Sequence, residues 1–190
     1  ACHALRRAVA AARRAGDVAV EENVLAALDE LKTAALERWH FLMLNDHSRN
    51  EAFAGAIGKA VAQLQHHPGM RTAGGVTALD IGTGTGLLAL LCARCAQDRV
   101  SIKRIHAVEM NPVLCDVARE VIEAATSTAG PEPRNLITLH PKSSFELTLT
   151  ERVDLVFCEI VDAGLLGEFL LPTLIDAGQR LLREGGLLIP

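Results

Sequence analysis

The sequence lacks a long apolar run and an excess of positive charge. Its longest apolar run, from Leu87 to Ala93, is far shorter than the about 20 residues that a membrane-spanning helix needs. The first 15 residues mix alanines with arginines and do not have the pattern of a signal peptide. The formal net charge of −4 disfavours a general nucleic-acid-binding surface. From these absences we expect a protein that has no membrane anchor and does not bind nucleic acid directly.

The sequence also lacks the cysteine pattern of a disulfide framework or a metal site. Its five cysteines are an odd number without secretory context, which indicates a reducing intracellular compartment, the cytoplasm or the nucleus. Cys92 and Cys95 form a C-x-x-C pair, but no second pair or histidine cluster accompanies them. We interpret both as packing residues of a helix, and the sequence predicts no metal site.

The chain of 190 residues is 49% hydrophobic and 22% charged, which is typical of a globular protein. This length is sufficient for one α/β domain and some additional helix. The chain does not begin with methionine and ends in Leu-Leu-Ile-Pro, so we expect it to be a piece of a longer protein.

The first part of the chain, residues 1–38, predicts a helical hairpin. Helices over 2–15 and 18–38 are expected to join at Ala15-Gly16-Asp17. Such a pair is either a plain hairpin or the end of a helical-repeat region, and its surface is a candidate for binding a protein partner. Residues 39–70 form a second segment, in which 50–65 is expected to be helical.

The remainder, residues 71–190, alternates between strands and helices. Repeated strand–helix units predict an α/β fold, with a doubly wound parallel sheet covered by helices on both faces. Ligands of such sheets bind at the carboxyl ends of the strands. The expected strands are 76–81, 103–108, 135–140, 153–158 and one that begins near 187; the expected helices are 86–97, 112–126 and 165–183.

A glycine-rich turn follows the first expected strand. Asp80 lies near the end of the strand, and Gly82, Gly84 and Gly86 lead into the next helix. Glycines allow the backbone to approach a ligand closely, and the free N–H groups of a helix N-terminus favour a polar or anionic group. The spacing matches the fingerprint of nicotinamide dinucleotide sites only weakly. The turn therefore predicts a ligand site whose chemistry other residues must decide.

An acidic residue, Glu109, ends the next strand. At this place in a doubly wound sheet, a carboxylate can accept hydrogen bonds from the hydroxyl groups of a ribose. The alternative interpretation is an N-cap acid ahead of the helix that begins at Pro112.

Two glutamates, Glu159 and Glu168, share the loop that follows strand 153–158. Two carboxylates aimed at one point bind a guanidinium through paired, charge-assisted hydrogen bonds. Asp162 lies between them and adds negative charge, which would favour an arginine with basic flanks. The alternative is a solvated acidic loop without a ligand.

Taken together, these motifs resemble the protein arginine N-methyltransferase family over residues 39–190. Asp80 and the three glycines resemble its first motif, and Glu159 and Glu168 resemble its two-glutamate loop. The resemblance implies the fold of the S-adenosylmethionine-dependent methyltransferases. It also implies that S-adenosylmethionine is the cofactor and that a methyl group passes from it to a guanidino nitrogen of a protein arginine.

The resemblance assigns four further residues. The segment from Met43 to Arg49 resembles the lid that closes over the cofactor, in which Arg49 would pair with the cofactor's carboxylate. His40 would also reach the cofactor, and Met43 would help to set the width of the substrate pocket. After the third strand, where many members have a glutamate near the adenine, Ser144 would supply a hydrogen bond instead.

The sequence also departs from the family. It has no tyrosine, although most members carry paired tyrosines at the start of the lid. The family continues beyond the residue that matches Pro190 into a β-barrel with a further catalytic histidine, and we expect these 190 residues alone to bind the cofactor without turnover. Two alternatives stay open: a methyltransferase for a small molecule or nucleic acid, and a non-catalytic relative that binds proteins.

Overall fold

A computed structural model describes residues 2–35, 42–66, 75–95, 102–128, 136–162 and 164–190. The chain forms two compact units, Ala1–Asp46 and His47–Pro190. The sequence predicts divisions at residues 38 and 70, whereas the two units of the structure divide after Asp46. Helix α4 (His47–His66) belongs to the same unit as the sheet.

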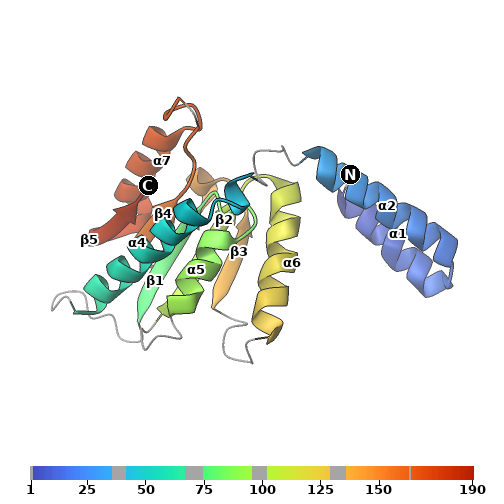
Figure 1. Cartoon of the computed structure of the whole chain (residues 1–190), viewed down its shortest axis with the longest axis horizontal. Helices are drawn as coiled ribbons and strands as arrows, with labels where there is room; N and C mark the ends of the chain where they lie inside the picture. Colours follow the sequence, from blue (N-terminus) through green and yellow to red (C-terminus); the bar gives the residue numbers. More distant parts are fainter. Residues whose placement is uncertain (1, 36–41, 67–74, 96–101, 129–135, 163) are drawn as a thin grey trace. The chain divides into compact units, whose positions relative to one another are not determined.

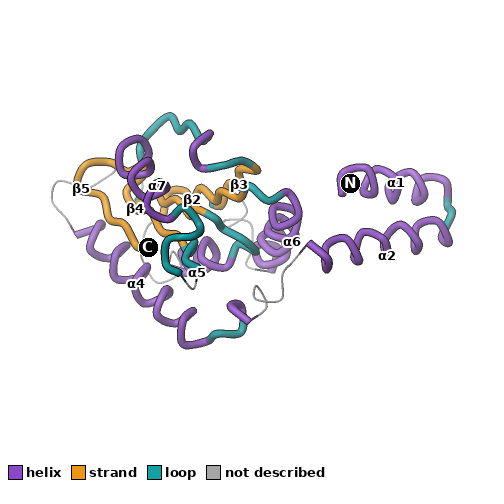
Figure 2. The backbone as a smooth tube through the Cα atoms, turned by 90° about the horizontal axis from the view of Figure 1, so that it is seen from above, coloured by secondary structure: helices purple, strands orange, loops and turns teal. Residues whose placement is uncertain are grey.

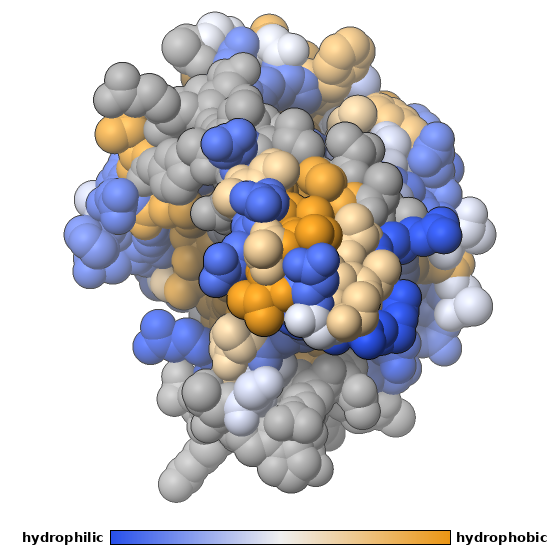
Figure 3. Space-filling model, turned by 90° about the vertical axis from the view of Figure 1, so that its right-hand side faces the viewer, coloured by the Kyte–Doolittle hydropathy of each residue, from blue (hydrophilic) through white to orange (hydrophobic). Residues whose placement is uncertain are grey.

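The first unit contains a helical hairpin of α1 (Cys2–Ala15) and α2 (Val18–Ala35). Gly16 turns the chain with a φ of +68°, a conformation that glycine adopts without strain. An ion pair of 2.6 Å between Arg13 and Glu21 links the two helices. Val18 and Val20 stay exposed on α2, and Figure 3 shows apolar residues gathered near the middle of one face of the molecule.

The second unit is built on a parallel sheet with the strand order β3-β2-β1-β4-β5 (Figure 1). The strands are β1 (Val76–Ile81), β2 (Ile102–Glu109), β3 (Ile137–Pro141), β4 (Val153–Cys158) and β5 (Leu182–Ile189). The helices are α4, α5 (Leu87–Cys95), α6 (Pro112–Thr128), the 3-10 turn η3 (Ser144–Glu146), α7 (Leu170–Asp176) and the π-helix η4 (Ala177–Leu181). The predicted α/β fold with a parallel sheet is confirmed.

Helices cover both faces of the sheet, and the side chains of each strand point alternately to one face and to the other. Ala78 packs with α4 and α5 in one buried cluster, whereas its neighbour Leu79 packs with the segment around α7 in a second cluster. Figure 2 shows the strands as a layer with α7 on one side and α4 and α5 on the other. The two central strands, β1 and β4, are thus buried on both faces almost throughout.

The last expected helix, 165–183, is wrong in its bounds. The helix begins at Leu170, and a π-helical turn, η4, replaces its end, so that β5 begins at Leu182. Leu165 and Phe169 have φ values of 69° and 60°, a left-handed conformation that the interior of a right-handed α-helix does not contain. Pro172 fits within the first turn of α7, where a backbone N–H has no partner in the helix.

Candidate active site

Asp80 of β1 holds the glycine-rich turn through two hydrogen bonds. Its Oδ2 accepts hydrogen bonds from Thr83 Oγ1 at 2.6 Å and from the backbone N–H of Ala89 at 3.0 Å. The carboxyl group is fully buried, and its Oδ1 has no hydrogen-bond partner among the described residues. Burial raises the pKa of Asp80 to about 7, although these two hydrogen bonds oppose the rise. This residue therefore shapes the turn from inside the protein.

The turn itself requires glycine. Gly82, Gly84 and Gly86 have φ values of 72°, 57° and 89°, which other residues rarely adopt. A Cβ atom at Gly82 would also lie 2.7 Å from Cγ2 of Ile160, on the loop after β4. The backbone N–H groups of Gly82 and Thr83 both donate to the carbonyl of Val108 at 2.9 Å, which ties the turn to the end of β2.

Glu109 joins the turn from the end of β2. Its Oε2 accepts the backbone N–H of Gly84 at 3.0 Å and its Oε1 that of Asn111 at 2.8 Å. The first residues of α6 are capped instead by Asn111, whose Oδ1 accepts the N–H of Val113 at 2.9 Å. Each oxygen of Glu109 retains a lone pair that can accept a hydroxyl group.

A cavity of about 320 Å³ opens at the carboxyl edge of the sheet. Its volume falls within the range of about 300–1,000 Å³ that small-molecule sites occupy. The predicted site residues that line it are Gly82, Glu109, Ser144 and Glu168. The glycine turn, the end of β2, the turn after β3 and the loop after β4 thus meet at one place. The other predicted site residues of the second unit do not line the cavity: Arg49, Asp80, Gly84, Gly86, Glu159 and Asp162.

Arg49 and Glu159 form an ion pair of 2.6 Å between Nη2 and Oε2. Arg49 comes from α4 and Glu159 from the loop after β4, and only 21% and 18% of their side chains are exposed. The guanidinium carbon of Arg49 also lies 5.5 Å from the centre of the Phe53 ring, within the range of a cation–π contact. The loop glutamate therefore already binds a guanidinium group in this structure.

Asp162 holds the turn between the two glutamates. Its Oδ1 accepts the N–H of Gly167 at 3.1 Å, and its carbonyl accepts the N–H of Leu165 at 2.9 Å. A Cβ atom at Gly167 would collide with the carboxylate of Asp162. Met43 belongs to the first unit, and His40 lies outside the described residues.

The cysteines of the second unit are suited to packing. Burial raises the pKa of the Cys115 and Cys158 thiols to about 11 and about 12, and it raises that of Cys92 as well, so these thiols stay protonated. Within the described ranges, no three histidine, cysteine or acidic side chains gather where they could hold a metal ion. In the same ranges, no helix is long and apolar enough to cross a membrane.

Comparison with known proteins identifies relatives of this chain. No protein-family model matches the sequence. An arginine Nω-methyltransferase of Streptomyces achromogenes subsp. streptozoticus is 39% identical over 157 residues, which cover 80% of this chain. Human protein arginine N-methyltransferase 9 is 37% identical over 152 residues, or 78% of this chain. The chain belongs to the protein arginine N-methyltransferase family.

Solved structures of this family have the same fold. The PRMT1 enzyme–prozyme heterotetrameric complex of Trypanosoma brucei with AdoHcy matches with a TM-score of 0.64 and 24% identity, over 80% of this chain and 42% of that one. Protein arginine methyltransferase 10 of Arabidopsis thaliana matches with a TM-score of 0.62 and 25% identity, over 83% and 39%. The chain spans only 37% of the Streptomyces relative and 16% of the human one.

Some residues at the cavity were not predicted from the sequence. Ile160 and Phe169 line the cavity, and Arg180 binds the backbone of the turn that forms its wall. Ile160 directly follows Glu159, so its place beside the glycine turn could have been expected from the loop's origin. Among the described residues, Arg180 donates hydrogen bonds to backbone carbonyls and to Asp176, and backbone contacts leave no signal in a sequence.

Proposed function

We propose that this chain carries the catalytic α/β domain of an S-adenosylmethionine-dependent protein arginine N-methyltransferase. The observation that carries the proposal is the cavity itself, because it joins the glycine turn and Glu109 to Glu168 of the two-glutamate loop. A cofactor site and a guanidinium-binding group thus share one space. The two curated relatives are both named for methyl transfer to arginine.

The residues of the cavity fit S-adenosylmethionine, which would supply an electrophilic methyl group on a sulfonium. Glu109 would accept the ribose hydroxyl groups with the lone pairs that its backbone contacts leave available. Gly82 would let the backbone lie against the ligand, and Ser144 would face the adenine. Arg49 would bind the carboxylate of the methionine part, and His40 and Met43 would complete the lid and the pocket.

Glu159 and Glu168 would bind the guanidinium of the substrate arginine. Paired carboxylates orient the planar group and leave one nitrogen directed at the methyl group. Much of the acceleration would come from position, since donor and acceptor must approach to about 3–3.5 Å. The negative charge of the pair also stabilises the product cation. Arg49 now occupies one of these carboxylates, so it must share or release Glu159 when the substrate binds.

The substrate we propose is an arginine in a protein, with basic residues around it. Asp162 supports this preference because it adds a third acidic group to the loop. A second candidate, free arginine, is favoured by the name of the Streptomyces relative, which mentions arginine and not protein. The helical hairpin is proposed as a surface for a protein partner. The cytoplasm or the nucleus is proposed as the location, because five cysteines, an odd number, are unlike a disulfide framework.

Mass spectrometry of methylation products tests the proposal. The full-length protein is incubated with S-adenosylmethionine and, separately, with an arginine peptide that has basic flanks, a peptide that has acidic flanks, and free arginine. We expect methylation of the basic peptide above all. Methylation of free arginine alone would support the small-molecule alternative, and binding of S-adenosylhomocysteine without any methylation would support a non-catalytic relative.

A further inference from the structure

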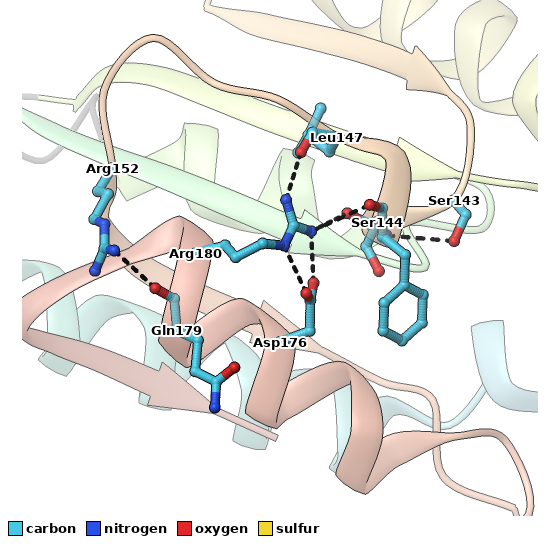
Figure 4. Close-up of polar contacts among 8 residues, drawn as sticks. Ser143, Ser144, Leu147, Arg152, Asp176, Gln179 and Arg180 are labelled. Atoms are coloured by element: carbon cyan, nitrogen blue, oxygen red, sulfur yellow. Dashed lines mark hydrogen bonds and ion pairs between the residues drawn. The ribbon is translucent and has the colours of Figure 1, made fainter.

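Arg180 binds three backbone carbonyls of a single turn. It projects from the π-helix η4 and donates from Nη1 to the carbonyl of Leu147 and from Nη2 to that of Ser144, both at 3.0 Å. A longer contact of 3.4 Å joins Nη2 to the carbonyl of Phe145. Figure 4 shows this guanidinium between η4 and the turn after β3.

Asp176 fixes the orientation of the same guanidinium. Its two carboxylate oxygens accept from Nε and Nη2 of Arg180, each at 2.6 Å, one helical turn earlier in the chain. A bidentate pair of this kind holds the planar fork in one direction. Because the pair is neutral overall, its effect on the cavity must come from geometry and not from charge. Single π-helical turns such as η4 occur often at functional sites.

The turn that Arg180 binds is one wall of the cavity. Ser143, Ser144 and Phe145 line the cavity on this side, and Thr173 of α7 lines it from the helix that continues into η4. Hydrogen bonds within the turn, such as that from the Leu147 N–H to the Ser144 carbonyl at 3.1 Å, set its shape. These hydrogen bonds stay within the turn, whereas those of Arg180 join the turn to η4.

We propose that Arg180, oriented by Asp176, is a positioning residue for the purine end of the cofactor site. It holds the turn of Ser143–Leu147 against α7 and η4, so that Ser144 meets the adenine at a fixed distance. This inference rests on the proposed function, since it assumes S-adenosylmethionine in the cavity. It assigns purine recognition to the placement of a backbone turn and not to a charged side chain.

Arg152 offers a matched control. It also donates to two backbone carbonyls of this region, that of Gln179 at 2.7 Å (Figure 4) and that of Leu182 at 3.3 Å. These acceptors belong to η4 and the start of β5, and not to the turn at the cavity. Removing Arg152 therefore costs two hydrogen bonds from an arginine to backbone carbonyls but leaves the cavity wall in place.

Calorimetry with two ligands tests the inference. S-adenosylhomocysteine and S-inosylhomocysteine differ only at the purine, where the amino group of adenine is replaced by an oxygen. Each is titrated into the wild-type protein and the Arg180→Ala, Arg180→Lys and Arg152→Ala variants, whose melting temperatures are also recorded. The ratio of the two dissociation constants reports on purine recognition, and a general loss of stability does not change it.

We expect the wild type and Arg152→Ala to prefer the adenine ligand to the same extent. Arg180→Ala should bind S-adenosylhomocysteine about tenfold more weakly and lose most of the preference. Arg180→Lys should not restore it, because one ammonium cannot reproduce the fork. If Arg180→Ala does not fold, Arg180→Lys and Asp176→Asn decide the question, since both keep a cation at this place.

Four results would count against the account, and they do not all contradict the same part of it. An unchanged ratio of dissociation constants in the Arg180 variants would overturn the inference, and so would equal affinity of the wild type for both ligands. An unchanged ratio in Asp176→Asn would overturn the role of Asp176. Failure of the wild type to bind S-adenosylhomocysteine would instead contradict the proposed function.

Discussion

Arg49 of α4 and Glu159 of the loop after β4 are joined by an ion pair of 2.6 Å. The sequence suggested separate roles for them, with Arg49 at the cofactor's carboxylate and Glu159 at the substrate's guanidinium. The structure places the two side chains in contact, with most of each removed from water. A contact between the two proposed binding sites follows: a ligand that draws Arg49 away would make Glu159 available.

The first prediction concerns Arg49. Arg49→Ala should weaken the binding of S-adenosylhomocysteine by about tenfold or more, as expected for a hydrogen bond to a charged group worth about 1.5–3 kcal/mol. Calorimetry measures this loss, and Lys59→Ala on the exposed side of the same helix is the control. Equal affinities of wild type and Arg49→Ala would contradict the proposed role of Arg49.

A second prediction concerns the order of binding. An arginine peptide should bind more tightly when S-adenosylhomocysteine is saturating, because the ligand's carboxylate attracts Arg49 and exposes Glu159. Fluorescence anisotropy of a labelled peptide, with and without the ligand, measures the difference. In Arg49→Ala, the peptide should bind equally well with and without saturating ligand. A persistent difference between ligand-bound and ligand-free Arg49→Ala would disprove this explanation.

The third prediction separates the charge of Asp162 from its structural contact. Asp162→Asn removes the charge but keeps an oxygen that can accept the N–H of Gly167. We expect turnover of a basic-flank peptide to fall relative to an acidic-flank peptide by a few fold, with a smaller difference at high salt. The ratio of kcat/KM for the two peptides is the measurement. A ratio equal to that of the wild type would show that Asp162 acts on the loop's shape alone.

The fourth prediction concerns the glycine turn. Gly82→Ala should lower the free energy of unfolding by about 1–3 kcal/mol, because of its positive φ and the contact with Ile160. Gly58→Ala is the matched control: it lies in α4 with no atom near the added methyl group, and should stabilise the protein by about 0.5–1 kcal/mol. Urea denaturation measures both, and equal effects of the two substitutions would contradict the account of the turn.

The fifth prediction concerns two histidines on neighbouring strands. Nδ1 of His106 lies 3.0 Å from Nε2 of His140. Burial, with smaller effects of His140 and Arg104, lowers the pKa of His106 to about 4, and burial and Lys142 lower that of His140. Between pH 6.5 and about 4 the unfolded chain therefore binds more protons than the folded chain, so that the free energy of unfolding decreases as the pH falls through this range.

His106→Gln should make the free energy of unfolding less sensitive to pH between 7 and 5. Asp80, whose pKa is raised to about 7, acts in the opposite direction over this interval, so the comparison must be between variant and wild type at each pH. Urea denaturation at both pH values gives the comparison, with exposed His66→Gln as the control. Equal pH dependence in wild type and His106→Gln would rule out the pair as the cause.

The sequence predicted the sheet because continuous apolar runs ending in Gly82 or Glu159 leave few other structures. The structure has β1 and β4 over the expected residues, 76–81 and 153–158. The loop before α7 could not be predicted from the sequence, because the left-handed conformations of Leu165 and Phe169 depend on tertiary contacts and not on residue type. The contacts of Arg180 were equally hidden, since any residue can supply a backbone carbonyl.

The central claim is that the two loop glutamates bind and orient an arginine for methyl transfer. Quantitative mass spectrometry of the basic-flank peptide with the full-length protein, Glu159→Gln and Glu168→Gln tests it most directly. We predict methylation by the wild type and a loss of about 100-fold or more in each variant, with binding of S-adenosylhomocysteine retained in Glu168→Gln. Unchanged turnover in both variants, or no methylation by the wild type, would contradict the claim.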